Sequence, residues 1–212
     1  MKDTREKLLK TAAKLFAQKG YTGTSVRDIV QRAGANLSAV QYYFGGKNGL
    51  YLATVAYLTG QIRAEMMKEM VLPQEISALS REQALDSLKQ MINRFLDMSF
   101  SRKNILLERI FTYAELEDSR TFRETLLNQT SRFRDTWYGL VSHLTGLKVG
   151  SAELILLCHT IFSQGHQSDF MRFAVCHQLK LKKYTPQLCD QIKELVWNNT
   201  RAILDLYNKE KK

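Results

Sequence analysis

Residues 25–50, SVRDIVQRAGANLSAVQYYFGGKNGL, constrain this chain more than any other stretch, because their pattern indicates two short helices joined by a tight turn. Ser25 and the acidic residue three positions later form a capping box, which begins a helix. Gly34 supplies the permissive backbone that ends this helix, and Asn36 is a good N-cap for a second helix over residues 37–44. The stretch therefore predicts a helix-turn-helix, whose second helix lies in the DNA major groove.

Residues 37–44 separate into two faces when they are wound at about 100° per residue. One arc is mostly apolar and is expected to pack on neighbouring helices; it holds Ala39, Val40, Tyr43 and Phe44. On the opposite arc, Gln41 suits adenine, Ser38 can bond either base edge, and Leu37 can contact a thymine methyl. Arg27, on the preceding helix, is a candidate for a guanine. A small packed helical pair without DNA is the alternative, and this helix alone leaves the two about even.

Phosphate contacts are expected from residues that flank the second helix. Gly45 and Gly46 break that helix, so Lys47 begins the next one. There the partial positive charge of a helix N-terminus adds to the charge of the ammonium group. The hydroxyl groups nearby can also bond phosphate oxygens. The predicted phosphate-contacting residues are Thr24, Ser25, Tyr42 and Lys47.

The charge of the chain is uneven. The formal net charge is +10, and residues 1–50 hold nine Lys and Arg against three Asp and Glu. A basic end on a weakly basic body suits a polyanion partner at that end. A solubilising surface charge is the equally weighted alternative when charge is considered alone.

Residues 5–58 resemble the N-terminal DNA-binding domain of the TetR (tetracycline repressor-like) family of bacterial regulators. The matching pieces are AAKLFAQKGYTGTSVRDIVQRAG and NLSAVQYYFGGKNGLYLA, which cover about a quarter of the chain. Tyr43 departs from the His that is frequent in the family, and Asn48 replaces a usual Glu. The resemblance implies a homodimer that binds double-stranded operator DNA. It also implies that a small-molecule effector binds in a C-terminal helical domain.

The remainder of the chain also predicts helices. Only two prolines, with few strand-like alternations, indicate an all-α protein. We expect a helix-turn-helix DNA-binding domain over residues 1–50, with a fourth, linking helix at 47–70. A larger helical effector-binding and dimerisation domain is expected over 51–212. About nine helices are predicted in all; besides the two of the helix-turn-helix and the linking one, they cover approximately residues 4–19, 81–100, 103–116, 120–145, 154–178 and 185–207.

A small-molecule pocket is predicted from the aromatic and soft side chains between residues 91 and 173. Aromatic walls with a few polar groups are the usual form of such a site. The candidate pocket residues are Phe95, Phe111, Tyr113, Phe133, Trp137, His159, Phe162 and His166. The alternative is that these rings are core, since aromatic residues at helical spacing mostly are.

The last two long helices carry broad apolar stripes, over residues 154–162 and 192–206. Such stripes exceed the need of a single intrachain core and favour an oligomer, although an extended core within one chain is the alternative. Dimerisation through these helices, as the resemblance implies, would place two recognition helices about 34–36 Å apart on a two-fold operator.

Other functional classes find little support in the sequence. The three cysteines are an odd number, the N-terminus MKDTREKLLK has no apolar leader, and no run of eighteen apolar residues occurs. We therefore expect a cytoplasmic protein without a membrane partner. No spacing predicts a metal site or a cofactor, and no catalytic motif indicates an enzyme.

Two functional hypotheses remain. The first is a dimeric, ligand-responsive transcriptional regulator, of the repressor type in the family that the chain resembles. The second is a DNA-binding or adaptor protein without an effector, in which the aromatic C-terminal half is only a dimer core.

Overall fold

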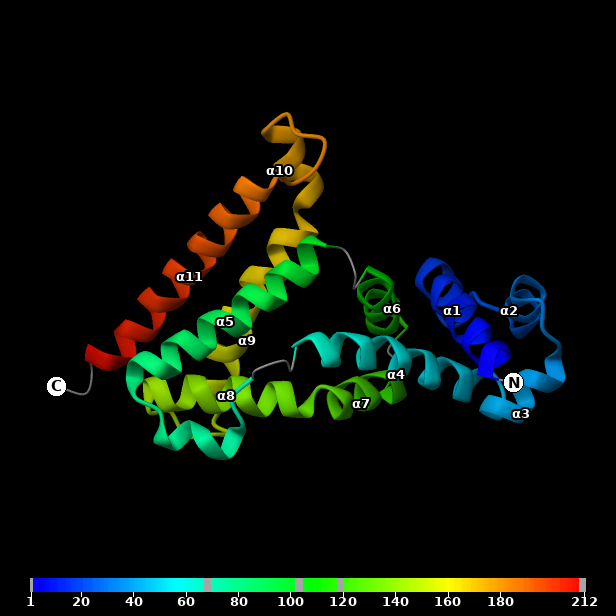
Figure 1. Ribbon diagram of the computed structural model, residues 1–212, viewed down its shortest axis with the longest axis horizontal. Helices are drawn as coiled ribbons and strands as arrows, with labels where there is room; N and C mark the ends of the chain where they lie inside the picture. The colour runs from blue at the N-terminus through cyan, green and yellow to red at the C-terminus, as the bar shows by residue number, and fades with distance from the viewer. Residues whose placement is uncertain (1, 67–69, 102–104, 118–119, 210–212) are drawn as a thin grey trace. The chain divides into compact units, whose positions relative to one another are not determined.

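The computed structural model describes residues 2–66, 70–101, 105–117 and 120–209, and every regular element in those ranges is a helix (Figure 1). Side chains are described in the same ranges except at 2, 61, 62, 65, 66, 121, 166–170, 208 and 209. The predicted all-α class is confirmed. The described chain divides into two compact units, residues 1–65 with 103–131 (unit 1) and residues 66–102 with 132–212 (unit 2).

Unit 1 is built around its first helix, α1 (Lys2–Lys19). It also contains α2 (Val26–Ala33), α3 (Leu37–Phe44), nearly all of α4 (Lys47–Met66), α6 (Ile105–Leu116) and α7 (Arg120–Gln129). Helix α1 packs against α2, α3 and α6. The apolar stripe of α1 forms one hydrophobic core with residues from the neighbouring helices. The fully buried residues of this core include Leu8, Phe16, Ile29, Val40, Leu50, Ile110 and Phe122.

The N-caps and the glycine turn around α2 and α3 form as the sequence predicts, but of the predicted capping box the structure gives only the bond to Ser25 Oγ. Ser25 Oγ accepts a hydrogen bond from the Asp28 amide at 3.0 Å, and Asn36 Oδ1 accepts one from the Ala39 amide at 2.8 Å. Each bond satisfies an amide that the first turn of a helix leaves without a partner. Gly34, at φ 64°, ends α2 in the left-handed region that glycine enters without steric cost. These bonds and the glycine fix both ends of the turn between the two helices.

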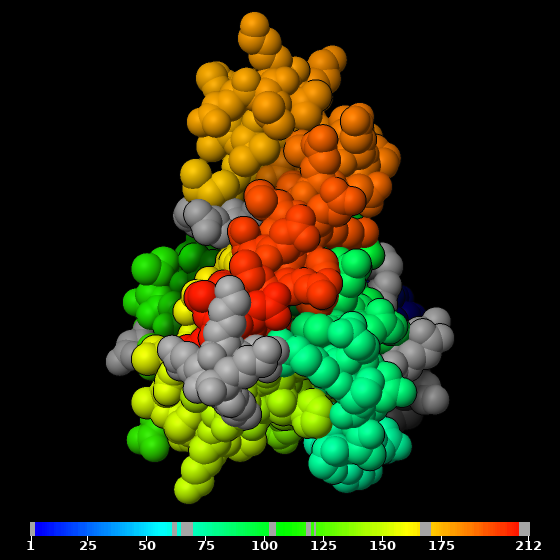
Figure 2. Space-filling view, turned by 90° about the vertical axis from the view of Figure 1, so that its left-hand side faces the viewer, coloured from blue at the N-terminus to red at the C-terminus, as the bar shows by residue number. Residues whose placement is uncertain are grey.

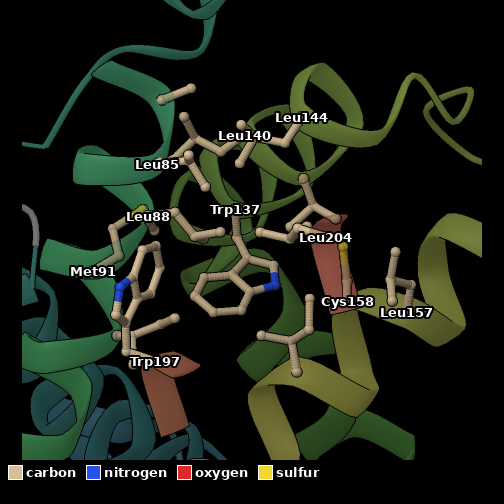
Figure 3. Close-up of a cluster of buried hydrophobic side chains, with 14 of the residues drawn as sticks. Leu85, Leu88, Met91, Trp137, Leu140, Leu144, Leu157, Cys158, Trp197 and Leu204 are labelled. Atoms are coloured by element: carbon tan, nitrogen blue, oxygen red, sulfur yellow. The ribbon is translucent and has the colours of Figure 1, made fainter. Parts of the chain in front are cut away.

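Unit 2 contains the short 3-10 helix η1 (Pro73–Ala78), α5 (Arg81–Phe100), α8 (Ser131–Thr145), α9 (Ala152–Phe170), α10 (Arg172–Gln178) and α11 (Pro186–Lys209). Helices α5, α9 and α11 pack on one another. Figure 3 shows their common core, where Trp137 of α8 is surrounded by leucines from α5, α8 and α11. This core contains Leu85, Leu88, Met91, Trp137, Leu140, Leu144, Leu157, Cys158, Trp197 and Leu204.

The described residues hold eleven α-helices and one 3-10 helix, against the nine helices predicted. The predicted helix over 120–145 is divided at Thr130, whose hydroxyl donates to the Leu126 carbonyl at 2.9 Å; such back-bonding bends helices. The predicted helix over 154–178 is divided at Met171, which has φ −84° and ψ 4°. The sequence predicts a boundary between functional domains after residue 50. The two compact units divide the chain at other places, and the functional boundary stays a prediction.

Candidate nucleic-acid interface

Helix α3 has one buried face and one exposed face. Val40 is 1% exposed in the core of unit 1, whereas Leu37 is 49% exposed and Tyr42 is 75% exposed. Ser38 and Gln41 are exposed beside them. The separation of faces that the winding predicts is therefore present. The exposed face offers an apolar group, a hydroxyl and an amide, which together can read thymine methyl groups and base edges.

A hollow of about 440 Å³ lies along this face. Val26 of α2 and Leu37 of α3 give it apolar walls, while Ser38 and Gln41 supply hydrogen-bonding groups; the other lining residues are Val40 and Gly46. Arg27 is exposed on α2. The residues predicted to read bases thus lie on the exposed surface of two adjacent helices.

Lys47 lies at the start of α4, where the backbone leaves α3 through two glycines. Gly45 has φ 68° and Gly46 has φ 114°, values that favour glycine and that explain the pair of glycines here. The Lys47 ammonium lies over the Tyr21 ring, 4.4 Å from its centroid. This cation–π contact holds a charged group at a helix N-terminus, an arrangement suited to a phosphate. Lys47 is partly exposed, and the phosphate candidates Ser25 and Tyr42 are exposed.

Thr24 does not fit its predicted contact with phosphate. Its side chain is buried, at 1% exposure. The hydroxyl donates toward the carbonyl of Gly20 at 2.7 Å and toward that of Leu15 at 3.2 Å. In the structure this hydroxyl therefore closes the turn between α1 and α2. The sequence prediction erred because a threonine before an N-cap is normally exposed.

Two contacts near this surface have no signal in the sequence. The Arg5 guanidinium lies 5.5 Å from the centroid of the Phe44 ring, which joins the start of α1 to the end of α3. Glu117, beyond the end of α6, accepts hydrogen bonds from the backbone after α1. Both pairs are distant in the sequence, so neither periodicity nor motif spacing brings them together.

Comparison with known families decides the assignment. The sequence model described as "Bacterial regulatory proteins, tetR family" matches residues 8–54, which contain α2 and α3. The model described as "HTH-type transcriptional dual regulator CecR, C-terminal domain" matches residues 84–205, more than half of the chain. The chain belongs to the TetR family. It is a transcriptional regulator with a DNA-binding domain, in a family whose members are not enzymes.

Relatives of this TetR-family regulator include the HTH-type transcriptional regulator YttP of Bacillus subtilis, which is 33% identical over 124 residues. That alignment covers 58% of this chain and 56% of YttP, so the chain spans little more than half the length of this relative. The dual regulator CecR of Shigella flexneri is 23% identical over 167 residues, 76% of this chain and 73% of CecR.

Solved structures share the fold of this TetR-family chain. A TetR-family regulator from Shewanella has a TM-score of 0.63 at 14% identity, covering 92% of this chain and 97% of that one. A regulator from Mesorhizobium loti has a TM-score of 0.59 at 16% identity, covering 96% of each chain. At these identities the likeness shows the fold alone.

Four of the predicted pocket residues of this TetR-family regulator form one aromatic cluster in unit 2. The Phe95 and Phe162 ring centroids are 4.5 Å apart, and those of Trp137 and Phe162 are 5.7 Å apart. Phe133 lies 6.0 Å from the rings of both Trp137 and Phe162. These contacts join helices α5, α8 and α9, and we call the four rings the aromatic cluster.

The other predicted pocket residues lie elsewhere. Phe111 and Tyr113 are on α6 in unit 1, where the Phe111 ring contacts Phe122 at 6.1 Å between centroids. His159 is exposed and shares a 3.2 Å hydrogen bond with the Tyr138 hydroxyl. The His166 side chain lies outside the described residues. The structure thus brings together only part of the predicted set. Phe111 and His159 are exposed, because helical spacing groups residues on one face of a helix but does not show what that face packs against.

The aromatic cluster holds a polar group without a partner. Trp137 is 3% exposed, and its indole Nε1 has no hydrogen-bond acceptor among the described residues. In Figure 3 the indole nitrogen is directed to the side of the core that holds Cys158 and Leu204. Cys158 on this side is 1% exposed, and its burial raises the pKa of its thiol to about 12. A buried donor left without an acceptor costs about 1–3 kcal/mol.

A second hollow, of about 330 Å³, lies on another part of unit 2. Ser87, Gln90 and Arg94 of α5 line it together with the apolar groups of Met70, Val71 and Met91. None of the predicted pocket residues contributes to this lining. Its volume is at the lower end of the range for small-molecule sites.

Helices α9 and α11 each bury one apolar face and expose another. On α9, Leu154 is fully buried whereas Leu156 is 67% exposed. On α11, Leu204 is fully buried whereas Leu195 and Leu206 are 61% and 63% exposed. The outer side of α11 is uncovered in Figure 2, where it runs across the face of unit 2 in orange to red. Exposed apolar faces on neighbouring helices are typical of a protein interface.

Within the described ranges no helix combines the length and the hydropathy that a membrane crossing needs. In the same ranges, no group of three or more His, Cys, Asp and Glu side chains is arranged to hold a metal ion.

Proposed function

We propose that this TetR-family regulator is a cytoplasmic repressor that binds a two-fold operator as a homodimer and is released by a small-molecule effector. The observation that carries the proposal is the exposed face of α3, with its hollow and its mixed apolar and hydrogen-bonding groups. The transcriptional roles in the names of YttP and CecR agree with it. So do the exposed leucines of α9 and α11, which a second copy of the chain would cover.

In this proposal Leu37, Ser38 and Gln41 read bases, with Arg27 available for a guanine, while Lys47 binds phosphate. Gln41 can make a bidentate pair with adenine, a contact worth about 1–3 kcal/mol of discrimination. Lys47 neutralises one phosphate and so contributes to affinity on every sequence and to its salt dependence. Base reading and phosphate binding therefore predict different effects of substitution.

The experiment begins with selection of duplexes from random-sequence DNA by the full-length protein. We expect a two-fold consensus whose half-sites lie about 34–36 Å apart. Gln41→Ala should weaken binding to the consensus and relax the preference at one base pair of each half-site. Lys47→Ala should weaken binding on all sequences and lower the slope of log affinity against log salt by about one per half-site.

Lys89→Ala is the matched control, because Lys89 is in unit 2, with its ammonium over the Trp197 ring. It removes the same charge and the same kind of cation–π contact from unit 2, whereas α3 and Lys47 belong to unit 1. If Lys47→Ala and Lys89→Ala have equal effects, and Gln41→Ala changes no preference, α3 is not the recognition helix.

The effector is proposed to bind at the aromatic cluster. The unpartnered Trp137 N–H favours a ligand that carries a hydrogen-bond acceptor on an apolar or aromatic body. Release of DNA requires that the ligand bind the DNA-incompetent state more tightly than the competent one.

A second candidate function, DNA binding without an effector, is favoured by how closely the rings pack. Phe95 and Phe162 are 4.5 Å apart, and Trp137 is nearly inaccessible, as expected of an ordinary core. A thermal-shift screen of small metabolites separates the two candidates, with Trp197→Phe protein leaving Trp137 as the single fluorescent indole. A compound that stabilises the protein, changes Trp137 fluorescence and weakens operator binding supports the first. A screen in which no stabilising compound alters DNA affinity supports the second.

A further inference from the structure

The carboxylate of Glu117 is bound by the backbone that follows α1. Its Oε2 accepts a hydrogen bond from the Tyr21 amide at 3.2 Å, and its Oε1 accepts one from the Thr22 amide at 3.0 Å. Beside it, the Tyr113 hydroxyl donates to the Gln18 carbonyl at 3.0 Å. The end of α6 thus holds the last turn of α1 at one point and the turn after it at two. Two of these three bonds are charge-assisted, the stronger kind.

Gly20 makes this close approach possible. A Cβ at residue 20 would lie 2.6 Å from Glu117 Oε1 and 2.9 Å from Tyr113 Cδ1. The residue also has φ 71°, where a side chain is strained. The backbone after α1 is therefore shaped to receive the carboxylate as well as to end the helix.

Tyr21 connects this carboxylate to the proposed phosphate-binding residue. Its amide bonds Glu117, and its ring lies under the Lys47 ammonium at 4.4 Å from the centroid. The ring is also fixed edge-on against Tyr51, with centroids 5.0 Å apart. Burial, and after it the negative charge of Glu117, raises the pKa of Tyr51. Backbone and ring of Tyr21 are thus both held, and the Lys47 ammonium lies against this fixed ring.

We propose that Glu117 is a positioning residue for DNA binding, which fixes Tyr21 and through its ring holds Lys47 toward a DNA phosphate. This inference rests on the proposed role of Lys47. For the effect of removing the Glu117 charge on DNA affinity, the inference predicts the opposite sign from charge alone. Removing an acidic group from a basic unit should strengthen attachment to a polyanion, whereas loss of the positioning contact should weaken it.

The test uses full-length protein and a duplex recovered by selection with the wild type. Glu117→Gln keeps the size of the side chain, but its NH₂ group must face one of the two amide donors. We expect the Kd for the selected duplex to rise roughly three- to tenfold at about 0.1 M salt, and the salt slope to fall by about one per half-site, as for one lost phosphate contact. Glu117→Asp, which keeps the charge but is one methylene shorter, should lose affinity as well.

A double-mutant cycle with Lys47→Ala separates positioning from a general structural effect. If Glu117 acts through Lys47, Glu117→Gln should cause no further loss in the Lys47→Ala protein. If Glu117→Gln weakens binding by the same factor in the wild type and in the Lys47→Ala protein, the proposal is overturned. Glu124→Gln is the charge control, because it removes the same charge from unit 1 but its carboxylate pairs with Arg120 on its own helix. It should leave the affinity equal to or slightly above that of the wild type.

The possible outcomes are distinct. A wild type that selects no duplex refutes the proposed function itself. A selected duplex that Glu117→Gln binds as well as, or better than, the wild type overturns the positioning role while leaving the proposed function intact. If far-UV circular dichroism shows that Glu117→Gln does not fold, Tyr21→Leu decides. It keeps the backbone amide that Glu117 binds and removes the ring under Lys47, together with the contacts of that ring with Phe16 and Tyr51. A loss that disappears in the Lys47→Ala background supports the proposal, and an independent loss overturns it.

Discussion

Thr24→Val tests whether the hydroxyl of Thr24 stabilises the fold or contacts DNA. The substitution keeps the shape of the side chain and removes the group that donates to the Gly20 and Leu15 carbonyls at 2.7 and 3.2 Å. One hydroxyl carries one proton, so the two distances amount to a single shared bond. Its loss, with a buried carbonyl left without this donor, should lower the free energy of unfolding of unit 1 by about 1–3 kcal/mol.

Thr112→Val provides a matched control. The Thr112 hydroxyl also donates to a carbonyl four residues back, that of Glu108 at 3.0 Å, but Thr112 is exposed. Water can replace its bond, so the cost should be about 0.5 kcal/mol or less. The two variants therefore differ mainly in burial.

Urea unfolding must be followed with a probe of unit 1. Both tryptophans, Trp137 and Trp197, lie in unit 2, so their fluorescence reports on that unit. Far-UV circular dichroism combined with hydrogen exchange of α1 peptides follows unit 1. Operator affinity is measured in the absence of urea, where Thr24→Val should stay within about twofold of the wild type because its hydroxyl is buried. An unchanged stability of α1 together with a uniform loss of affinity on all sequences would refute the structural assignment.

Three further predictions concern packing and burial. Gly165→Ala should destabilise unit 2 by about 1–3 kcal/mol in urea unfolding, because the added Cβ would lie 2.7 Å from Phe95 Cε1. Gly60→Ala should instead stabilise the protein by about 0.5–1 kcal/mol, because its Cβ would have no described atom of another segment within 4 Å. At pH 8 a thiol reagent should label half-buried Cys189 before Cys158, as followed by peptide mass spectrometry. Because the pKa of Cys158 rises from 9.0 to about 12 on folding, the unfolded thiol ionises first and the stability should fall between pH 9 and 12. The fall should be smaller in Cys158→Ala, where the raised pKa of Tyr51 still contributes.

The helix-turn-helix could be predicted in detail because its determinants are local. Ser25 and Asn36 bond amides three residues away, and Gly34 acts through its own φ. Each signal lies within one turn of the helix that it begins or ends, so the sequence contains the complete interaction. The same holds for the exposed face of α3, since a helix of known register has only one side that can pack on α1.

Other parts of the site depend on contacts between distant segments. Glu117 and Tyr21 are 96 residues apart, and no pattern in either segment indicates the other. Phe111 and Phe95 have the same apolar periodicity, yet Phe111 is 43% exposed on unit 1, with its ring against Phe122, whereas Phe95 packs in unit 2. Thr24 was predicted to contact a phosphate because nothing nearby shows that the turn folds back onto α1 and buries its hydroxyl. Tertiary packing decides each of these cases, and a single sequence does not contain it.

The division of the chain into two units changes how an effector could act on DNA binding. The sequence suggests one connection, the long helix α4. The structure has three, because α6 and α7 belong to unit 1 although α5 and α8, before and after them in the chain, belong to unit 2. A rearrangement of α5 or α8 therefore has a covalent route to the segment that carries Glu117. The bonds from Glu117 to the turn are 3.2 and 3.0 Å long, and a displacement of α6 by about 1 Å would extend both beyond hydrogen-bonding distance. A shift of that size, which is typical of switching helices, would release Tyr21 and with it the constraint on Lys47.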